Sequence, residues 1–366
     1  MSRIDGGQDI MAWQGIEGHD AVAARFATAA AQGRVAGSYL FIGLPGIGKT
    51  TFARKLAKAL VCHALRPGLV ACDACASCVQ ADAGSHPDID VVQKPVDRSA
   101  IPLEAFVGDA EHRMREGLCW RIKLRPALGA RKAAIILDAD LLLEEAANSL
   151  LKTLEEPPDG AVIILVGTSL ERQLPTIRSR CQIVRFQPLE PEIMARILTR
   201  ESSASGSTAD EATLRGVAHA SGGSLERARL LLDPAAIEFR GKLLTMLSRR
   251  PFRGVELAKE TIAFVEAAGA EAPPRRARAK IVFEAVIDFY RACLRSLTVG
   301  EPPADPVLAK AVAAWEDGAN DGADEAATLL EQTLDAIDAV DRYANLTMLI
   351  DAWTAILEQP RLAQTG

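Results

Sequence analysis

Long apolar runs, aromatic side chains and excess positive charge are all scarce in this chain of 366 residues. No run approaches the ~20 apolar residues that a helix needs to cross a bilayer. The acidic, polar amino terminus lacks the basic-then-apolar layout of a signal peptide. Aromatic residues make up 5% of the chain and the net charge is −6, so any contact with nucleic acid would be local or shared with partners. These absences predict a cytoplasmic protein without membrane partners.

Cysteine is infrequent outside one cluster. The chain has seven, and a reducing compartment makes a disulfide framework unexpected. Four of them form the pattern C-x₉-C-x₂-C-x₂-C, in which a tight turn directs neighbouring thiolates at one ion. Four protein ligands leave no position open for substrate, so the site is predicted to be structural. The predicted zinc ligands are Cys62, Cys72, Cys75 and Cys78.

Other interpretations of these thiols remain open at this point. The four could be unrelated, or a C-x-x-C pair could be redox-active, although no thioredoxin-like strand precedes it. His63 and His86 could each replace a thiolate ligand, but a site of four cysteines needs neither. The remaining cysteines stand alone and are expected to be inert: Cys119, Cys181 and Cys293.

Short apolar runs alternate with helical patterns through about residue 187, which indicates a doubly wound parallel sheet. Beyond that point the strand patterns disappear and helical patterns continue. We therefore predict an α/β fold followed by an all-α part. The predicted domains are 1–187, with the cysteine insertion at about 62–78, then 188–234 and 235–366. The predicted strands are 38–42, 89–92, 134–137, 162–166 and 183–186.

Proline, glycine and serine mark the predicted ends of helices. A helix over 144–155 should stop at Pro157-Pro158. The Ser- and Gly-rich stretch Glu201–Thr208 predicts a surface loop. Interruptions are expected at Ala270–Pro274 and Gly300–Pro306. A final helix should bury one apolar stripe made of Leu346, Ile350, Trp353 and Leu357.

The most informative stretch is Gly43–Thr50, which fits G-x-x-x-x-G-K-[ST] between a predicted strand and a predicted helix over 51–60. Glycines let successive backbone N–H groups turn toward an anion, and the helix presents its positive end to phosphates. The lysine would reach the outer phosphates and the threonine hydroxyl would bind Mg²⁺. A chance glycine-rich turn is the alternative. The pattern predicts nucleotide binding, with ATP and Mg²⁺ as the candidate ligands, by Gly43, Gly46, Gly48, Lys49, Thr50 and Thr51.

A second nucleotide element is predicted where the apolar strand 134–137 ends in Asp138. A carboxylate at this edge of a sheet can hold Mg²⁺, directly or through water; a strand-end cap is the alternative. Hydrolysing relatives of this fold place a glutamate next, but here the residue is Ala139, which cannot act as a base. Asp140 should lie near the direction of Asp138 or beyond the strand. The pattern predicts nucleotide binding without efficient hydrolysis.

Two further polar elements follow the next predicted strand. Thr168 comes directly after it, where a hydroxyl could contact a γ-phosphate or its water, or could simply be a polar loop residue. Arg178 and Arg180 lie in a short polar element before the last strand. By themselves, two such arginines usually coat a surface.

Together these residues resemble the bacterial clamp-loader ATPase family of the AAA+ superfamily. The resemblance covers roughly residues 15–232, and its distinctive parts are Asn148–Pro158 and Ser179-Arg180-Cys181. It implies a RecA-like domain, a small helical lid and a carboxyl-terminal collar for oligomerisation. It also implies that Arg180 reaches the ATP site of a neighbouring subunit, and that the partners are the loader subunits delta and gamma/tau, with the sliding clamp and primer-template DNA met through the complex.

Two departures from the family's motor subunit, gamma/tau, bear on activity. Ala139 replaces the hydrolytic glutamate, and Glu226 stands where gamma-like proteins place a nucleotide-sensing arginine. Arg227 is one residue away, about 100° around a helix, and should not substitute. The resemblance therefore implies a stator that completes the ring and donates Arg180. An active motor of the gamma/tau type and a stand-alone zinc-containing nucleic-acid binder remain the alternatives.

Overall fold

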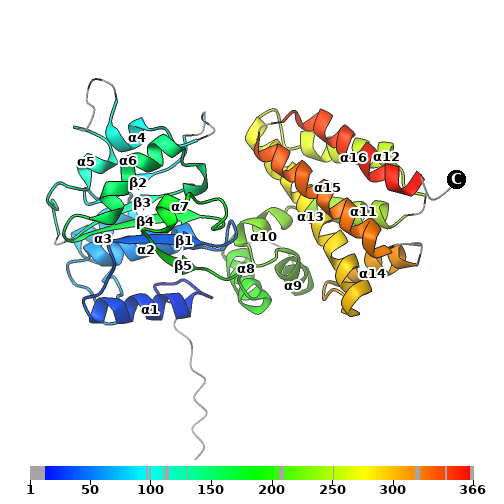
Figure 1. Cartoon of the computed structure of the whole chain (residues 1–366). Coiled ribbons are helices and arrows are strands. Elements are labelled where there is room, and N and C mark those ends of the chain that lie inside the picture. The colour runs from blue at the N-terminus through cyan, green and yellow to red at the C-terminus, as the bar shows by residue number, and fades with distance from the viewer. Residues whose placement is uncertain are drawn as a thin grey trace, which may run out of the picture. The chain divides into compact units, whose positions relative to one another are not determined.

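The computed structural model describes residues 13–95, 98, 100–109, 111, 115–129, 131–205, 210–249, 251–317, 322–342 and 344–362. The chain divides into two compact units (Figure 1). The sheet unit comprises Met1–Ile193 with Gly223–Leu225, and the helical unit comprises Met194–Gly222 with Glu226–Gly366. The predicted three-domain boundaries at 187 and 234 stay a prediction.

The sheet unit is built on five parallel strands in the order β2-β3-β4-β1-β5. Valine and isoleucine dominate these strands, as expected for strands buried on both faces of a sheet. The predicted strands are confirmed with shifts at their ends; the third, for example, begins two residues before its expected start. The strands are β1 (Ser38–Ile42), β2 (Ile89–Val92), β3 (Lys132–Ile136), β4 (Ala161–Gly167) and β5 (Gln182–Arg185).

Helices cover both faces of this sheet, because successive side chains of each strand point to opposite faces. Tyr39 and Phe41 of β1 pack on α1 (Asp20–Ala31) and α2 (Lys49–Val61). Leu40 and Ile42 belong to the core on the other face. That second core includes residues of α4 (Glu104–Val107), α5 (Leu118–Arg121), α6 (Glu144–Glu155) and α7 (Pro175–Arg178).

Parallel strands bring their carboxyl ends to one edge of the sheet. β1 pairs with β4 and β5, and β3 pairs with β2 and β4. Gly43 follows β1, Asp138 lies two residues beyond β3, and Thr168 follows β4. The predicted nucleotide residues therefore gather at this edge, since they follow neighbouring strands.

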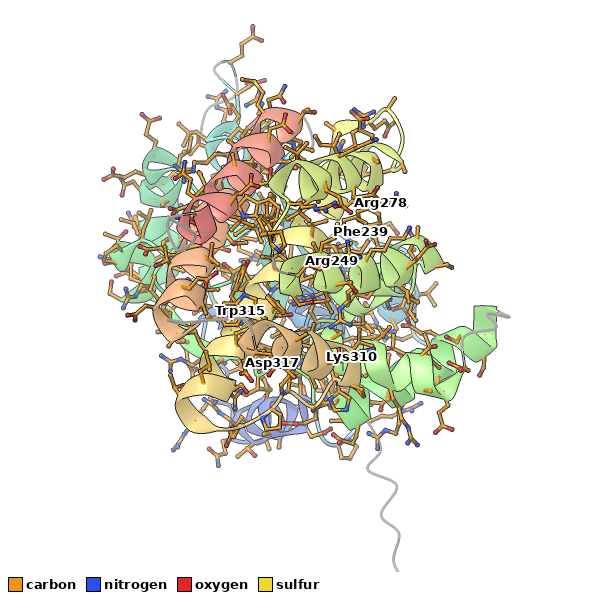
Figure 2. All side chains as sticks on the ribbon, turned by 90° about the vertical axis from the view of Figure 1, so that its right-hand side faces the viewer. Phe239, Arg249, Arg278, Lys310, Trp315 and Asp317 are labelled. Atoms are coloured by element: carbon orange, nitrogen blue, oxygen red, sulfur yellow. The ribbon has the colours of Figure 1, made fainter. Side chains whose placement is uncertain are left out.

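The helical unit has a separate apolar core, which includes the buried indoles of Trp315 and Trp353. Phe239 stacks on Phe264 with ring centroids 4.2 Å apart. Figure 2 labels Phe239 and Trp315 among the side chains of these helices. The helices are α8 (Pro191–Ser205), α9 (Glu211–Ala220), α10 (Leu225–Leu231), α11 (Pro234–Ser248), α12 (Gly254–Glu266), α13 (Ala272–Val299), α14 (Pro306–Glu316), α15 (Gly322–Asp341) and α16 (Leu346–Leu362).

Two predicted breaks in the helices differ from the structure. The predicted loop Glu201–Thr208 is wrong for residues 201–205, which continue α8, and residues 206–208 lie outside the described residues. Glu201 pairs with Arg229 of α10 at 2.6 Å, an interaction that supports the added turn and that no local pattern reveals. The break predicted at Ala270–Pro274 ends earlier, because proline is tolerated in the first turn of a helix and α13 begins at Ala272.

The predicted break at Gly300–Pro306 is confirmed, with α13 ending at Val299 and α14 beginning at Pro306. The stripe predicted on the last helix is also confirmed for Ile350, Trp353 and Leu357, which are buried, whereas Leu346 is half-buried against the same core. None of the helices in the described residues combines the length and the apolar character that a bilayer span requires.

Candidate nucleotide site and metal centre

The glycine loop between β1 and α2 has the backbone of a phosphate cradle. Gly43, Gly46 and Gly48 have φ angles of 156°, 71° and 99°, a region that glycine occupies without steric cost. A Cβ atom on Gly43 would lie 2.6 Å from the carbonyl oxygen of Phe186. Helix α2 begins at Lys49, two residues before its predicted start, so Thr50 and Thr51 stand in its first turn. That end of a helix favours anions.

The side chain of Lys49 folds back on this loop. Its Nζ donates hydrogen bonds to the carbonyl oxygens of Gly43 and Leu44, both at 2.6 Å, and the residue is buried. The ammonium group therefore lies at the loop itself, within reach of an anion seated there.

His19 contributes to the loop although no sequence motif marks it. Its Nε2 lies 2.6 Å from the carbonyl oxygen of Ile47, and its ring packs edge-on against Phe186 with centroids 4.9 Å apart. Burial lowers the pKa of His19, although the hydrogen bond to Ile47 opposes that shift. The neutral imidazole therefore donates from Nε2 and supports the loop without adding positive charge.

Asp138 stands at the carboxyl edge of the sheet, as predicted, with its side chain exposed. Its φ of 54° is in the left-handed region, which is uncommon for residues other than glycine and here turns the chain into a short 3₁₀ helix, η1 (Ala139–Leu141). Ala139 is buried, so the position after Asp138 offers a methyl group within the core.

Asp140 lies in η1, beyond the end of β3. Of its two predicted positions, near the direction of Asp138 or beyond the strand, the structure shows the second. Its carboxylate accepts the backbone N–H of Thr168 at 2.8 Å and a hydrogen bond from the Gln173 side chain. The carbonyl oxygen of Thr168 in turn accepts the N–H of Gly43 at 3.2 Å. Asp140 therefore ties the end of β4 to the glycine loop, and its oxygens are occupied by structural hydrogen bonds.

A second strap on the loop comes from the segment Gly223–Leu225 of the sheet unit. The N–H of Leu225 donates to the carbonyl oxygen of Gly46 at 3.0 Å. Gly223 has a φ of +83°, and a Cβ atom there would lie 2.7 Å from the backbone nitrogen of Leu189. The sequence suggested a functional role for this region only through Glu226 and Arg227.

Arg180 lies two residues after the end of α7. Its polar contacts are with α6 and with residues in or next to α7, not with the glycine loop. Its guanidinium pairs with Glu155 of α6, with Nη2 and Nε at 2.5 and 2.7 Å from Oε1. Its Nη1 donates to the carbonyl oxygen of Thr176 and the hydroxyl of Ser179. The Arg180 side chain is 27% exposed, so part of the guanidinium faces solvent.

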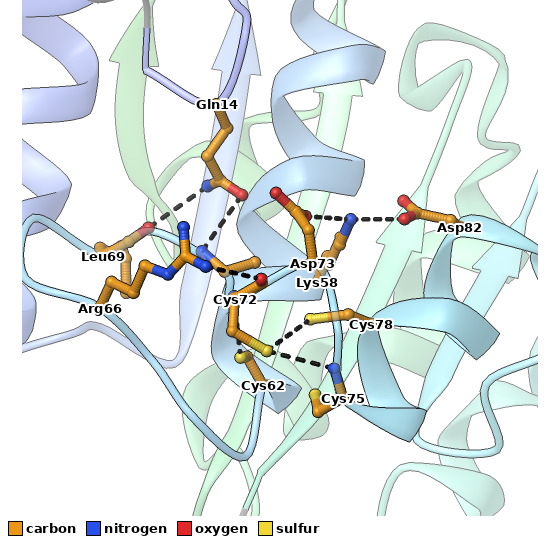
Figure 3. Close-up of polar contacts among 11 residues, drawn as sticks. Gln14, Lys58, Cys62, Arg66, Leu69, Cys72, Asp73, Cys75, Cys78 and Asp82 are labelled. Atoms are coloured by element: carbon orange, nitrogen blue, oxygen red, sulfur yellow. Dashed lines mark hydrogen bonds and ion pairs between the residues drawn. The ribbon is translucent and has the colours of Figure 1, made fainter.

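The four predicted zinc ligands converge. The Sγ atoms of Cys62, Cys72, Cys75 and Cys78 all lie within 4.8 Å of one another, and those of Cys72 and Cys78 are 3.8 Å apart (Figure 3). Tetrahedral zinc with Zn–S bonds of about 2.3 Å places its sulfurs about 3.8 Å apart. The four thiols therefore fit zinc.

Neither histidine that could replace a thiolate joins this group within the described residues. The Nε2 atoms of His63 and His86 lie 3.1 and 3.0 Å from the Ser77 hydroxyl, and His63 also contacts the carbonyl oxygen of Leu128. Both imidazoles are therefore occupied around Ser77.

Hydrogen bonds and burial shift the pKa values of these thiols. Backbone N–H groups of Ala74 and Cys75 lower the pKa of Cys72 to about 6, because they stabilise its thiolate. Burial raises the pKa of Cys78 to about 12, and a bound cation would favour loss of that proton. Burial also raises the pKa of Cys181 to about 12, which agrees with an inert thiol.

Charged and polar contacts fasten the cysteine insertion to α2 and to the chain before α1. Lys58 of α2 is buried and its Nζ lies 2.5 Å from both Asp73 and Asp82. Burial would lower the pKa of Lys58, but the two carboxylates raise it above its usual value. The Trp13 indole donates a hydrogen bond to the carbonyl oxygen of Gly68. The Gln14 side chain, shown in Figure 3, donates to the carbonyl oxygen of Leu69 and accepts from the N–H of Ala71.

Comparison with known proteins finds a family match that lies within the sheet unit. Residues 18–190 match the family described as "DNA polymerase III, delta subunit". The chain is 36% identical over 171 residues to DNA polymerase III subunit delta′ of Bacillus subtilis (strain 168), which covers 46% of this chain and 48% of that protein.

Two further relatives come from other bacteria. The identity is 34% over 218 residues to subunit gamma/tau of Mycobacterium tuberculosis (strain ATCC 25618 / H37Rv), covering 60% of this chain and 36% of that one. It is 32% over 169 residues to subunit delta′ of Escherichia coli (strain K12), covering 46% and 48%. The matched region is thus about half, or less, of the length of each of these relatives.

Proposed function

We propose that this chain, which resembles the clamp-loader subunits of bacterial DNA polymerase III and most of all delta′, acts as a delta′-type stator. In this role it completes the loader ring, keeps a nucleotide pocket with little hydrolytic activity, and donates Arg180 to a neighbouring ATPase subunit while the sliding clamp is loaded. The observation that carries the proposal is the edge after β3. There a buried methyl group, Ala139, follows Asp138, and Asp140 is committed to Thr168 and Gln173.

The nucleotide pocket would use residues of one sheet edge. The N–H groups of the loop at Gly43, Gly46 and Gly48 and the Lys49 ammonium would neutralise the phosphates, and Thr50 with Asp138 would hold Mg²⁺. Thr51 and Thr168 complete the set. ATP with Mg²⁺, when bound, supplies charge that these groups recognise. The next residue after Asp138 is Ala139, and the Asp140 carboxylate is engaged by Thr168, so neither is placed to activate water.

The start of helix α10, at Glu226 and Arg227, supports the same proposal. Glu226 is acidic, and the neighbouring Arg227 pairs with Asp288 at 2.6 Å and with Glu284 at 3.2 Å, both on α13. Its guanidinium is therefore engaged within the helical unit. We propose that 188–234 forms the lid and 235–366 the collar through which delta and gamma/tau are met, with the clamp and primer-template DNA reached through the complex.

The isolated chain is expected to hydrolyse ATP far more slowly than about 1 s⁻¹, the lower end of usual enzyme turnover. The reason is that no general base follows Asp138. Phosphate release by the purified chain measures this, and a parallel Lys49→Ala preparation reports contaminating ATPase. Turnover near 1 s⁻¹ that disappears in Lys49→Ala would instead support a gamma/tau-type motor, a second candidate favoured by the intact glycine loop.

Arg180→Ala is expected to lower ATP turnover of the reconstituted loader several-fold while the subunits still assemble. An arginine supplied in trans is worth ~10³–10⁵ in rate where it has been measured in GTPases, but only the site served by this chain loses it. Arg178→Ala is the matched control, because that arginine is exposed at the end of α7, two residues before Arg180. Equal turnover in the wild-type and Arg180→Ala loaders would refute the trans role.

A further inference from the structure

Arg180 is anchored at its backbone by a small apolar contact. Ile177, three residues before it, and Cys181, directly after it, are both buried. They lie in the same core as Leu150 and Leu154 of α6. The backbone on both sides of Arg180 is therefore held against α6, and the position of the guanidinium depends on how the long side chain is directed.

The guanidinium is directed by contacts from two sides. The Nε and Nη2 atoms of Arg180 both pair with Oε1 of Glu155. Its Nη1 donates hydrogen bonds to the Thr176 carbonyl oxygen and the Ser179 hydroxyl. The Glu155 side chain is 50% exposed, so the pair lies at the surface. The carboxylate is the only acidic partner of Arg180 among the described residues.

The carboxyl end of helix α6 does not favour an acidic residue at this point. Glu155 is its last residue, and the carboxyl end of a helix carries partial negative charge that disfavours a carboxylate. The favourable electrostatic partner of Glu155 is the guanidinium of Arg180, 25 residues further along the chain.

We propose that Glu155 is a positioning residue for Arg180, holding the guanidinium at the surface in the orientation from which it reaches the neighbouring subunit's nucleotide. This inference rests on the proposed trans role of Arg180. Glu155 itself touches no nucleotide. By holding the guanidinium in one orientation, Glu155 lowers the conformational entropy that Arg180 loses when it contacts the phosphoryl group. This is the benefit of preorganisation.

The test uses the loader reconstituted from the full chain and its delta and gamma/tau partners, with kcat and KM for ATP measured. Glu155→Ala is expected to lower kcat roughly 3- to 10-fold, because misdirected catalytic groups lose rate steeply. KM should stay unchanged, since no ground-state contact to nucleotide is removed. Glu155→Gln should recover most of the rate, because an amide oxygen can accept the same hydrogen bonds.

Matched controls separate this inference from the proposed function. Glu156→Ala removes the neighbouring exposed carboxylate, which has no ion pair with any of the described residues, and should leave kcat unchanged. Glu155→Ala added to Arg180→Ala should lower kcat no further. If Arg180→Ala slows the loader and Glu155→Ala leaves kcat unchanged or raises it, the positioning role is refuted alone. If Arg180→Ala has no effect, both proposals fall.

Discussion

Cys72→Ser is expected to release the metal from the chain and to unfold the segment between Cys62 and Cys78. Structural zinc contributes ~10–16 kcal/mol of apparent binding free energy in zinc-finger peptides. Apart from the cysteines, the buried apolar side chains of the insertion are Leu69 and Ala71, so most of its stability should come from the four thiolates. Metal analysis should find one zinc per wild-type chain and almost none in Cys72→Ser. Limited proteolysis should show cleavage within 62–78 in the variant alone.

Cys119→Ser is the control for this experiment. Cys119 is buried against α6 and its Sγ donates to the carbonyl oxygen of Ser149, a contact that a serine hydroxyl can keep. This variant should retain zinc and resist protease like the wild type. A wild-type chain that is fully folded and protease-resistant without metal would show that the four cysteines are not a structural zinc site.

Loss of nucleotide binding is the expected result of Gly43→Ala. The added Cβ atom would meet the Phe186 carbonyl oxygen at 2.6 Å and Ile47 Cδ1 at 2.7 Å, and one of these contacts is to backbone. The loop must therefore move, which would misplace the N–H groups proposed to bind the phosphates. We expect ATP affinity, measured by calorimetry with Mg²⁺, to fall at least about 100-fold, equivalent to ~2.8 kcal/mol.

Gly33→Ala controls for the backbone strain of this substitution. Gly33 also has a positive φ, +66°, but a Cβ atom there meets nothing within 4 Å. It should lose about 1 kcal/mol of stability and bind ATP like the wild type. Thermal unfolding of both variants verifies that they are folded. If Gly43→Ala is folded and keeps wild-type affinity, the loop is not where the phosphates bind.

Features written in short stretches of sequence were predictable. The glycine loop, the apolar strands and the thiol cluster depend on spacings of a few residues, and backbone geometry converts those spacings directly into structure. The predicted ends of elements were less accurate. Helix α8 continues through the serine-rich residues 201–205, where a loop was expected, because Arg229 of another helix pairs with Glu201.

The partners of individual polar side chains were decided by tertiary structure. Asp140 meets Thr168 and Gln173 only because β3 and β4 are neighbours in the sheet, and Glu155 meets Arg180 only because α7 packs on α6. His19 and Lys58 show no local signal, yet they brace the glycine loop and the cysteine insertion. By itself the sequence determined which chemical groups are present and which is missing after Asp138. The packing of distant elements decided which groups are occupied, since a hydrogen bond forms between atoms about 3 Å apart, whatever their separation in the chain.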